Sequence, residues 1–208
     1  MNVALIGATG RTGQHLLGEL LRRGHTVTAL ARDPNKLTGP DRGVRVVVGS
    51  VTDPPAIREM LDGTEAVVSA LGPTAKEADL HTRTAYLLVE FMPPAGISRF
   101  IGISGAGIDV PGDRKGAKDR VISAIIRTIG GALAKDKPAE YQVLANSTLD
   151  RTLVRPPRLL DSPTTGRISH GPHTPGHWSI PRADLATFLV DVLDGHLYPH
   201  QAPFVWAK

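Results

Sequence analysis

A glycine-rich turn near the first residues constrains the fold more than any other feature. Gly7, Gly10 and Gly13 follow an apolar run at Val3–Ile6 and lead into a helical pattern. In such a strand–turn–helix, the first glycine permits a tight turn and the second lets the backbone approach a pyrophosphate. The third glycine lets the helix pack closely on the strand. The alternative is a turn that needs glycine only for its positive φ. The position between strand and helix favours a dinucleotide site.

Strand and helix patterns alternate through most of the chain. Several of the β-branched runs are apolar on both faces, as central strands of a covered parallel sheet are. Repeated strand–helix–strand order implies right-handed crossovers, so we expect an α/β fold with a doubly wound parallel sheet, the Rossmann fold. The expected strands are Val3–Ile6, Thr26–Ala31, Val44–Val48, Ala66–Ala70, Phe100–Ser104 and Thr152–Arg155. The expected helices are Thr12–Arg23, Pro54–Leu61, His81–Met92, Pro138–Asn146 and Arg182–Leu193, with a short final segment at Ala202–Ala207.

The length predicts one domain over residues 1–208. After Pro156 and Pro157 the composition shifts, and residues 156–181 are rich in Pro, Gly, Thr and His with little periodicity. We interpret this stretch as a loop-rich substrate cap over the carboxyl ends of the strands, where open α/β sheets bind their ligands.

The composition excludes several classes of function. The absence of cysteine excludes thiol nucleophiles, iron–sulfur clusters and cysteine-ligated zinc. Aromatic residues make up 4% of the chain and the net charge of +4 is scattered, which argues against nucleic-acid binding. No basic leader precedes the first strand, and the longest apolar stretch, Val121–Ala134, is interrupted and too short to span a bilayer. We expect a cytoplasmic protein without a membrane partner or a metal, present as a monomer or homodimer.

The second strand bears on the choice of cofactor. Arg32 stands at its end and Asp33 comes one step later. A carboxylate there accepts hydrogen bonds from an adenosine ribose, whereas arginine attracts a 2′-phosphate. Arg11 in the glycine turn is a second candidate cation, and the alternative for both arginines is a solvated surface charge. The pattern favours NADP(H) over NAD(H).

Polar and small residues also follow the third and fourth strands. Ser50 and Val51 are placed to meet the adenine edge, and Leu71 and Gly72 to lie along the cofactor toward its nicotinamide. Either pair could be an ordinary strand-to-helix turn. Because they follow neighbouring strands, they strengthen the prediction of a dinucleotide site.

Taken together, five stretches resemble the NmrA-like, atypical short-chain dehydrogenase/reductase family. Within it, the length, the Arg-Pro-Pro run and the stretch from Asp194 to His200 are most similar to the biliverdin IXβ reductase and flavin reductase branch. The resemblance spans nearly the whole chain. The stretches that carry it are residues 7–13, 32–34, 98–104, 149–156 and 180–186.

The resemblance implies an NADP(H)-binding Rossmann protein with its substrate laid over the nicotinamide. By position, Ser104 matches a serine that hydrogen-bonds the substrate, and Pro156 matches the loop beside the nicotinamide. The glycine turn, including Gly13, matches the pyrophosphate site. The other positions that match cofactor contacts are Gly7, Thr9, Gly10, Arg11, Thr12, Arg32, Ser50, Val51, Leu71 and Gly72.

The chain departs from the wider family at the proton donor. The family's Tyr-x-x-x-Lys pair uses the lysine to lower the tyrosine pKa. Here Lys137 stands at the lysine place, but Leu133 stands where the tyrosine belongs. In the biliverdin-type branch a histidine follows the proline pair, and this chain has Arg158 there. Arginine neutralises an anionic substrate but is a poor proton donor.

These features predict an NADPH-dependent reductase that transfers a hydride to a conjugated small molecule such as a flavin, a tetrapyrrole or a quinone-like ring. Ser104 would orient the acceptor, Arg158 would offset its negative charge, Lys137 would hold the ribose, and solvent would supply the proton. His177 is an alternative proton donor. The alternative function is a non-catalytic redox sensor of the NmrA type, which binds dinucleotide and regulates a partner.

The segment at residues 114–134 has no assigned role. Its apolar part could be a lid, a self-association face or an ordinary core helix. Arg114, Lys115, Lys118 and Arg120 precede it, and we interpret them as a solvated basic surface.

Overall fold

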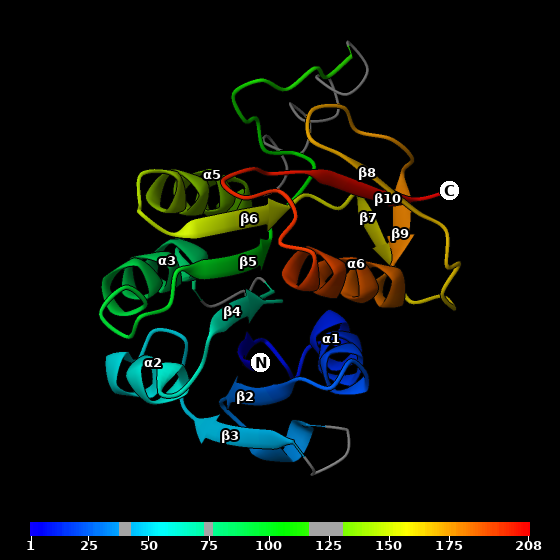
Figure 1. Ribbon diagram of the computed structural model, residues 1–208. Coiled ribbons are helices and arrows are strands. Elements are labelled where there is room, and N and C mark those ends of the chain that lie inside the picture. The colour runs from blue at the N-terminus through cyan, green and yellow to red at the C-terminus, as the bar shows by residue number, and fades with distance from the viewer. Residues whose placement is uncertain (38–42, 73–76, 117–130) are drawn as a thin grey trace.

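A six-stranded parallel sheet forms the centre of the computed structural model (Figure 1). The structure describes residues 1–37, 43–72, 77–116 and 131–208, with only the backbone described for residues 131–134. The order of the sheet is β3-β2-β1-β4-β5-β6, so the chain reverses direction across the sheet between β1 and β4. The expected doubly wound α/β fold is confirmed. The strands are β1 (Asn2–Ile6), β2 (Thr26–Ala31), β3 (Val44–Val48), β4 (Ala66–Ser69), β5 (Arg99–Ile103) and β6 (Asp150–Val154).

Helices cover both faces of this sheet. On one face lie α1 (Arg11–Arg22) and α6 (Arg182–Asp194), which pack against each other (Figure 1). On the other face lie α2 (Pro54–Leu61), α3 (Leu80–Phe91) and α5 (Gly131–Ala145). A short 3-10 helix, η1 (Pro34–Lys36), follows β2. None of the helices in the described ranges is long and apolar enough to cross a bilayer.

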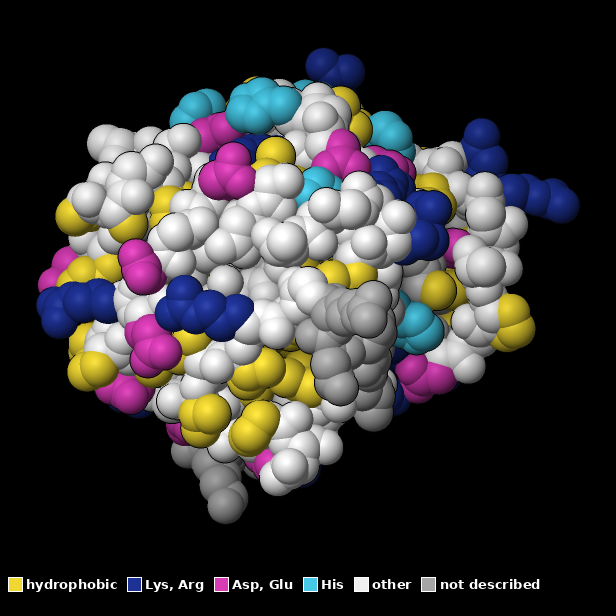
Figure 2. Space-filling model, turned by 60° about the horizontal axis from the view of Figure 1, so that its bottom comes forward, with side chains coloured by type: hydrophobic (Ala, Val, Ile, Leu, Met, Phe, Trp, Pro, Cys, Tyr) yellow, Lys and Arg dark blue, Asp and Glu magenta, His cyan; other side chains and the backbone are white. Residues whose placement is uncertain are grey.

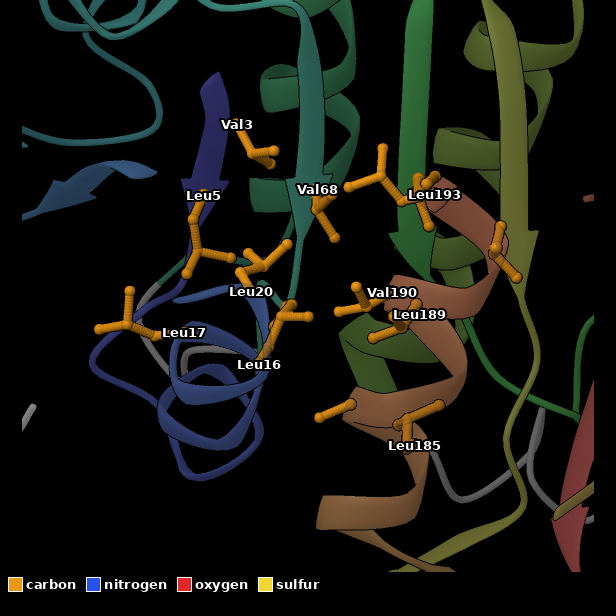
Figure 3. Close-up of a cluster of buried hydrophobic side chains, with 14 of the residues drawn as sticks. Val3, Leu5, Leu16, Leu17, Leu20, Val68, Leu185, Leu189, Val190 and Leu193 are labelled. Atoms are coloured by element: carbon orange, nitrogen blue, oxygen red, sulfur yellow. The ribbon is translucent and has the colours of Figure 1, made fainter. Parts of the chain in front are cut away.

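Alternate residues of β1 divide the core between the two faces. Val3 and Leu5 pack in the cluster that holds α1 and α6, and Ala4 and Ile6 pack in the cluster on the opposite face. Figure 3 shows the leucines of α1 and α6 converging on the first of these clusters. Each fully buried aliphatic side chain contributes about 1.5–3 kcal/mol. The two clusters fix the ends of the parallel strands, where the candidate site residues lie.

Most predicted elements agree with the structure to within two residues, but α5 does not. The sequence predicted a helix over Pro138–Asn146, with proline in its first turn, whereas α5 begins at Gly131 and contains Pro138 in its interior. Proline is favoured at a helix start but tolerated inside at a cost. The predicted start of this helix was therefore wrong. Most of the apolar segment Val121–Ala134 lies outside the described residues.

The predicted loop-rich cap contains more regular structure than expected. Three short strands occur in it, β7 (Arg158–Leu160), β8 (Ile168–Gly171) and β9 (Ser179–Pro181). β7 pairs with β9 in parallel, and β8 pairs in antiparallel with β10 (Phe204–Ala207) near the other end of the chain. Pairing satisfies backbone groups that a loop of this length would leave exposed. The absence of periodicity hid strands of only three or four residues.

The free edge of β6 is covered by residues that come much later in the chain. The backbone N–H of Leu153 donates to the carbonyl of Gln201 (3.1 Å), and that of Arg155 donates to Pro203 (2.8 Å). The Thr152 hydroxyl donates to the carbonyl of Tyr198 (2.8 Å). The segment before β10 therefore completes this side of the central sheet.

Candidate functional site

The glycine turn forms a backbone cradle between β1 and α1. Gly7 has φ +81°, and a Cβ there would lie 2.7 Å from the carbonyl oxygen of Ala70 in the turn after β4. A Cβ on Gly13 would lie 1.9 Å from the carbonyl oxygen of Gly7. The N–H of Gly10 donates to that same carbonyl (3.0 Å), which closes the turn. The first turn of α1 directs unpaired N–H groups and the positive end of the helix dipole toward this cradle. These are the features that bind a pyrophosphate.

A pocket of about 190 Å³ opens beside the cradle. Pockets for drug-sized ligands are roughly 300–1,000 Å³, so this volume suits one part of a dinucleotide. Its lining comes from the turns after β1, β2, β3 and β4, and from the segment that enters α3. The lining residues are Gly7, Thr9, Gly10, Leu30, Ala31, Arg32, Gly49, Ser50, Val51, Ala70, Leu71, Gly72, Glu77 and Leu80.

Arg32 and Asp33 differ in the contacts that their side chains make. Arg32 is exposed at the pocket and forms no ion pair with any residue in the described ranges. Asp33 accepts a hydrogen bond from the N–H of Asn35 (3.1 Å) and lies 3.6 Å from the ammonium of Lys36. Asp33 therefore serves as the N-cap of η1, and the guanidinium of Arg32 is the positively charged group that lines the pocket.

Arg11 contacts the cap rather than the pocket. Its guanidinium lies 2.6 Å from one carboxylate oxygen of Asp161, and Arg182 lies 2.6 Å from the other. Arg182 also donates to the hydroxyl of Thr12 (3.0 Å). The hydrogen bond from Arg182 and the charge of Arg11 lower the pKa of Asp161. Asp161 thus joins the glycine turn to the cap and to α6.

A buried pair positions the turn after β4. One ring nitrogen of His81 lies 2.7 Å from the carboxylate of Asp136 and the other lies 3.2 Å from the carbonyl oxygen of Leu71. Asp136 also accepts hydrogen bonds from the N–H groups of His81 and Thr82 at the start of α3. Burial raises the pKa of Asp136, but these hydrogen bonds outweigh it and the pKa is lowered. The pocket wall at Leu71 is therefore fixed through α3 and α5.

Ser104 and Lys137 lie near each other at the end of β5. The Ser104 hydroxyl is buried and has no hydrogen-bond partner in the described part of the chain. The ammonium of Lys137 donates to the carbonyl of Ile103, the residue before Ser104 (2.9 Å), and to Glu140 (2.8 Å). Buried hydroxyl groups are normally paired, so an unpaired one beside a pocket-forming strand end is a candidate ligand contact. Neither Ser104 nor Lys137 lines the pocket described above.

A buried ion pair holds the segment after β5 against the cap. Arg155, whose side chain is 0% exposed, makes two 2.7 Å contacts with the carboxylate of Asp113. Its Nε donates to the carbonyl of Ala202 (2.7 Å). Pro156 is buried, and its carbonyl accepts a hydrogen bond from Ala106 (3.1 Å). These contacts position the chain on either side of Ser104.

The prediction of a solvated basic surface was wrong for Lys115. Its side chain is 3% exposed, and its ammonium donates to the carbonyls of Ala106 and Ile108. Carbonyl groups at the turn after β5 form a site for a buried ammonium, which sequence spacing does not reveal. Lys118 and Arg120 lie outside the described residues.

Two candidates for contact with substrate lie in the cap with exposed side chains. Arg158 opens β7, where its N–H donates to the carbonyl of Trp178 (3.1 Å) and its side chain is exposed. His177 is also exposed. On the face shown in Figure 2, Lys and Arg side chains lie among Asp and Glu side chains and form no continuous basic stripe.

The structure gathers many of the predicted cofactor residues in one pocket. Those that line it are Gly7, Thr9, Gly10, Arg32, Ser50, Val51, Leu71 and Gly72. Gly13 supports the turn from behind, Arg11 and Thr12 lie at the start of α1, and Ser104 and Pro156 lie toward the cap. Sequence reasoning missed Glu77 and Leu80. Their only signal was their place after β4, at the same edge of the sheet as the other lining residues.

A protein-family model described as NAD(P)H-binding matches residues 7–196. A 3-diazoavenalumate denitrifying reductase from a Streptomyces species is 36% identical over 99 residues, which cover 48% of this chain and 28% of that protein. The uncharacterized Bacillus subtilis protein YwnB is 32% identical over 107 residues, covering 51% of this chain and 48% of YwnB. The chain thus spans about half, or less, of these two relatives.

Solved structures match over the whole chain. A candidate NADH-flavin reductase from Streptococcus pneumoniae has a TM-score of 0.82 and 25% identity, with all of both chains covered. The anaerobilin reductase ChuY from Escherichia coli O157:H7 has a TM-score of 0.84 and 21% identity, covering all of this chain and 98% of that one. These matches confirm the Rossmann fold, and the family model and the Streptococcus pneumoniae structure confirm the expected resemblance to nicotinamide-binding proteins.

Proposed function

The chain belongs to the NAD(P)H-binding family, and we propose that it is an NADPH-dependent reductase that transfers a hydride to a conjugated small molecule. The observation that carries the proposal is the joint arrangement at the sheet edge. Arg32 lines a pocket beside a glycine cradle, the Ser104 hydroxyl is buried on the cap side, and neither has a side-chain partner among the residues that the structure describes. The pocket and the glycine cradle fit the cofactor, and the Ser104 hydroxyl fits an acceptor.

The preference for the phosphorylated cofactor rests on Arg32. A guanidinium without an ion-pair partner among the described residues is free to bind a 2′-phosphate through charge-assisted hydrogen bonds. Asp33, the carboxylate that would favour an unphosphorylated ribose, is engaged by Asn35 and Lys36. Both observations support NADPH over NADH.

The roles proposed for the protein's own residues are binding and orientation. When bound, NADPH supplies a hydride at its nicotinamide. Ser104 would orient the acceptor through its free hydroxyl, and the third donor of Lys137, beyond those used by Ile103 and Glu140, would hold the ribose. Arg158 would offset negative charge on the acceptor. Alignment of the reacting atoms by such contacts can supply about 7–11 kcal/mol of barrier reduction.

A conjugated acceptor agrees with the lack of a tyrosine proton donor. Its π system spreads the incoming charge, so solvent can deliver the proton. The named activities of the flavin reductase and anaerobilin reductase that share this fold make flavins and linear tetrapyrroles the first acceptors to test.

The experiment is an acceptor screen with the purified chain and NADPH. We expect loss of the reduced-nicotinamide absorbance with at least one acceptor among a flavin, a linear tetrapyrrole and a quinone. Ser104→Ala should then reduce kcat/KM for that acceptor by about tenfold or more while leaving NADPH binding unchanged, because it removes an acceptor contact.

Binding and turnover distinguish the reductase from the alternative sensor. If NADPH binds with micromolar affinity and no acceptor in the panel is reduced, the reductase proposal fails and the chain is better described as a dinucleotide sensor. If NADPH does not bind, both functions are wrong.

A further inference from the structure

Glu77 is the acidic residue among those that line the candidate cofactor pocket. It lies between β4 and α3, and its Oε2 atom is buried without a hydrogen-bond partner among the described residues. Arg32 lines the same pocket, yet no ion pair joins the two side chains in the part of the chain that the structure describes. A buried, unpaired carboxylate oxygen is unfavourable unless a donor arrives from elsewhere. A donor on a bound ligand that reaches this oxygen would satisfy it.

The surroundings of Glu77 suit a flat, apolar-faced group with a donor on its edge. Four leucine and valine side chains contribute to the lining, and they come from the ends of β2, β3 and β4 and from the start of α3. They are Leu30, Val51, Leu71 and Leu80. Apolar walls with a few placed polar groups are typical of sites for small heterocycles.

The position in the sheet assigns this pocket to the adenosine part of the cofactor. Its walls come from the turns after β1 to β4, and none of its lining residues follows β5 or β6, where Ser104 and Pro156 lie. Arg32, as the proposed contact of the 2′-phosphate, marks the ribose. A carboxylate is a poor partner for a phosphorylated ribose because the two charges repel. Of the donors left on adenosine, the ribose 3′-hydroxyl lies next to the 2′-phosphate, and the exocyclic amino group of the base is the donor that lies away from that charge.

We propose that Glu77 accepts a hydrogen bond from the 6-amino group of the cofactor's adenine and so makes the site selective for adenine. The inference rests on the proposed binding of NADP(H). It identifies a specificity-determining residue outside the glycine turn and the strand end that carries Arg32.

The test compares NADPH with its hypoxanthine analogue, which carries a 6-oxo group in place of the 6-amino group. Dissociation constants are measured by calorimetry or by the fluorescence of bound reduced nicotinamide, without any turnover. The native protein should bind NADPH about 10- to 100-fold more tightly, because the oxo group presents lone pairs to a buried carboxylate. In Glu77→Gln the amide can donate to the oxo group, so the ratio of the two constants should fall toward one.

Two further variants keep the result interpretable. Glu90→Gln removes the same charge from an exposed position on α3 and should leave the ratio at the native value. Thermal melting checks the fold of each protein. Glu77→Ala removes the acceptor altogether and should also lower the ratio, so it takes the place of the Gln variant if that variant does not fold.

The outcomes separate this inference from the proposed function. If the native chain binds NADPH but does not discriminate against the analogue, or if Glu77→Gln keeps the native ratio, Glu77 does not read the base and the cofactor assignment stands. If neither dinucleotide binds the native chain, the proposed function fails and the role of Glu77 fails with it.

Discussion

The two parts of the site are held by different kinds of interaction. In the cofactor part, backbone segments pack so closely that Gly7 and Gly13 leave no space for a Cβ. In the cap part, ionised side chains join segments far apart in the chain, as Arg155 joins Asp113 and Asp161 joins Arg11 to Arg182. The first arrangement depends on the absence of side chains, and the second on their charges. Substitutions should therefore affect the two parts in different ways.

The largest effect on stability is expected at the buried pair of the cap part. Arg155→Met keeps most of the side-chain volume but leaves Asp113 buried without its main partner, which should lower the free energy of unfolding by about 3–5 kcal/mol. Denaturant unfolding measures the loss. Arg83→Ala, at an exposed pair with a 4.0 Å separation, is the control and should change stability by less than about 0.5 kcal/mol. Equal losses in the two variants would show that the burial of Arg155 is not decisive.

The next largest effect is expected in the cofactor part, where it depends on backbone packing and not on charge. Gly13→Ala places a Cβ 1.9 Å from a backbone oxygen that cannot move freely, so it should cost about 3 kcal/mol and abolish NADPH binding. Gly18→Ala is the control in the same helix, because nothing lies within 4 Å of its added Cβ. It should stabilise the protein by up to about 1 kcal/mol. Retained NADPH binding in Gly13→Ala would contradict a rigid backbone cradle.

At Arg32, dinucleotide binding in the cofactor part is expected to depend on charge. Arg32→Ala should weaken NADPH binding by about 10- to 100-fold and NADH binding by less than about threefold, since only NADPH carries the 2′-phosphate. The comparison is a pair of titrations for each protein. Equal losses for the two dinucleotides would show that the phosphate assignment is wrong.

The cap part should respond to acid through Asp184 at the start of α6. Burial raises its pKa, but hydrogen bonds from Thr164, Thr165 and Gly166 outweigh this and the pKa is lowered. A lowered carboxyl pKa contributes stability above the unfolded value of 3.8, and this is lost as the pH falls below it. Asp184→Asn should cost about 1–3 kcal/mol at pH 7 and less at pH 3. An undiminished cost at pH 3 would rule out the charge as its source.

The smallest effect is expected where the two parts meet. Asp161 is half-exposed, so Asp161→Asn should leave the free energy of unfolding almost unchanged. It also releases Arg11 and removes a negative charge near the cradle, so NADPH should bind a fewfold more tightly in low salt. Binding titrations at two salt concentrations measure this, and unchanged affinity in low salt would indicate that Arg11 does not face the cofactor.

The same contrast explains what the sequence could predict. The glycine turn and Arg32 could be placed because their roles follow from local order, a strand, then a turn, then a helix. The partners of Arg155 and Asp161 lie 42 and 150 residues away along the chain, at Asp113 and Arg11, and no spacing rule reports such pairs.

Two further features were not predicted from the sequence, each for a local reason. Strands β7, β8 and β9 have three or four residues each, too few for alternation to show. Glu77 stands in a polar stretch that looks like any turn, and only the meeting of strand ends gives its carboxylate a pocket. The glycine turn was thus easier to predict from the sequence than the position of Glu77, which depends on segments that lie far apart in the chain.

The late covering of β6 has a consequence for biosynthesis. The acceptors for the backbone N–H groups of Leu153 and Arg155, and for the Nε of Arg155, come from residues 201–203. During translation, the ribosome releases the glycine turn and the first four strands long before these residues emerge. The nascent chain therefore carries an open sheet edge, a site for pairing with other chains, until the segment before β10 has left the exit tunnel.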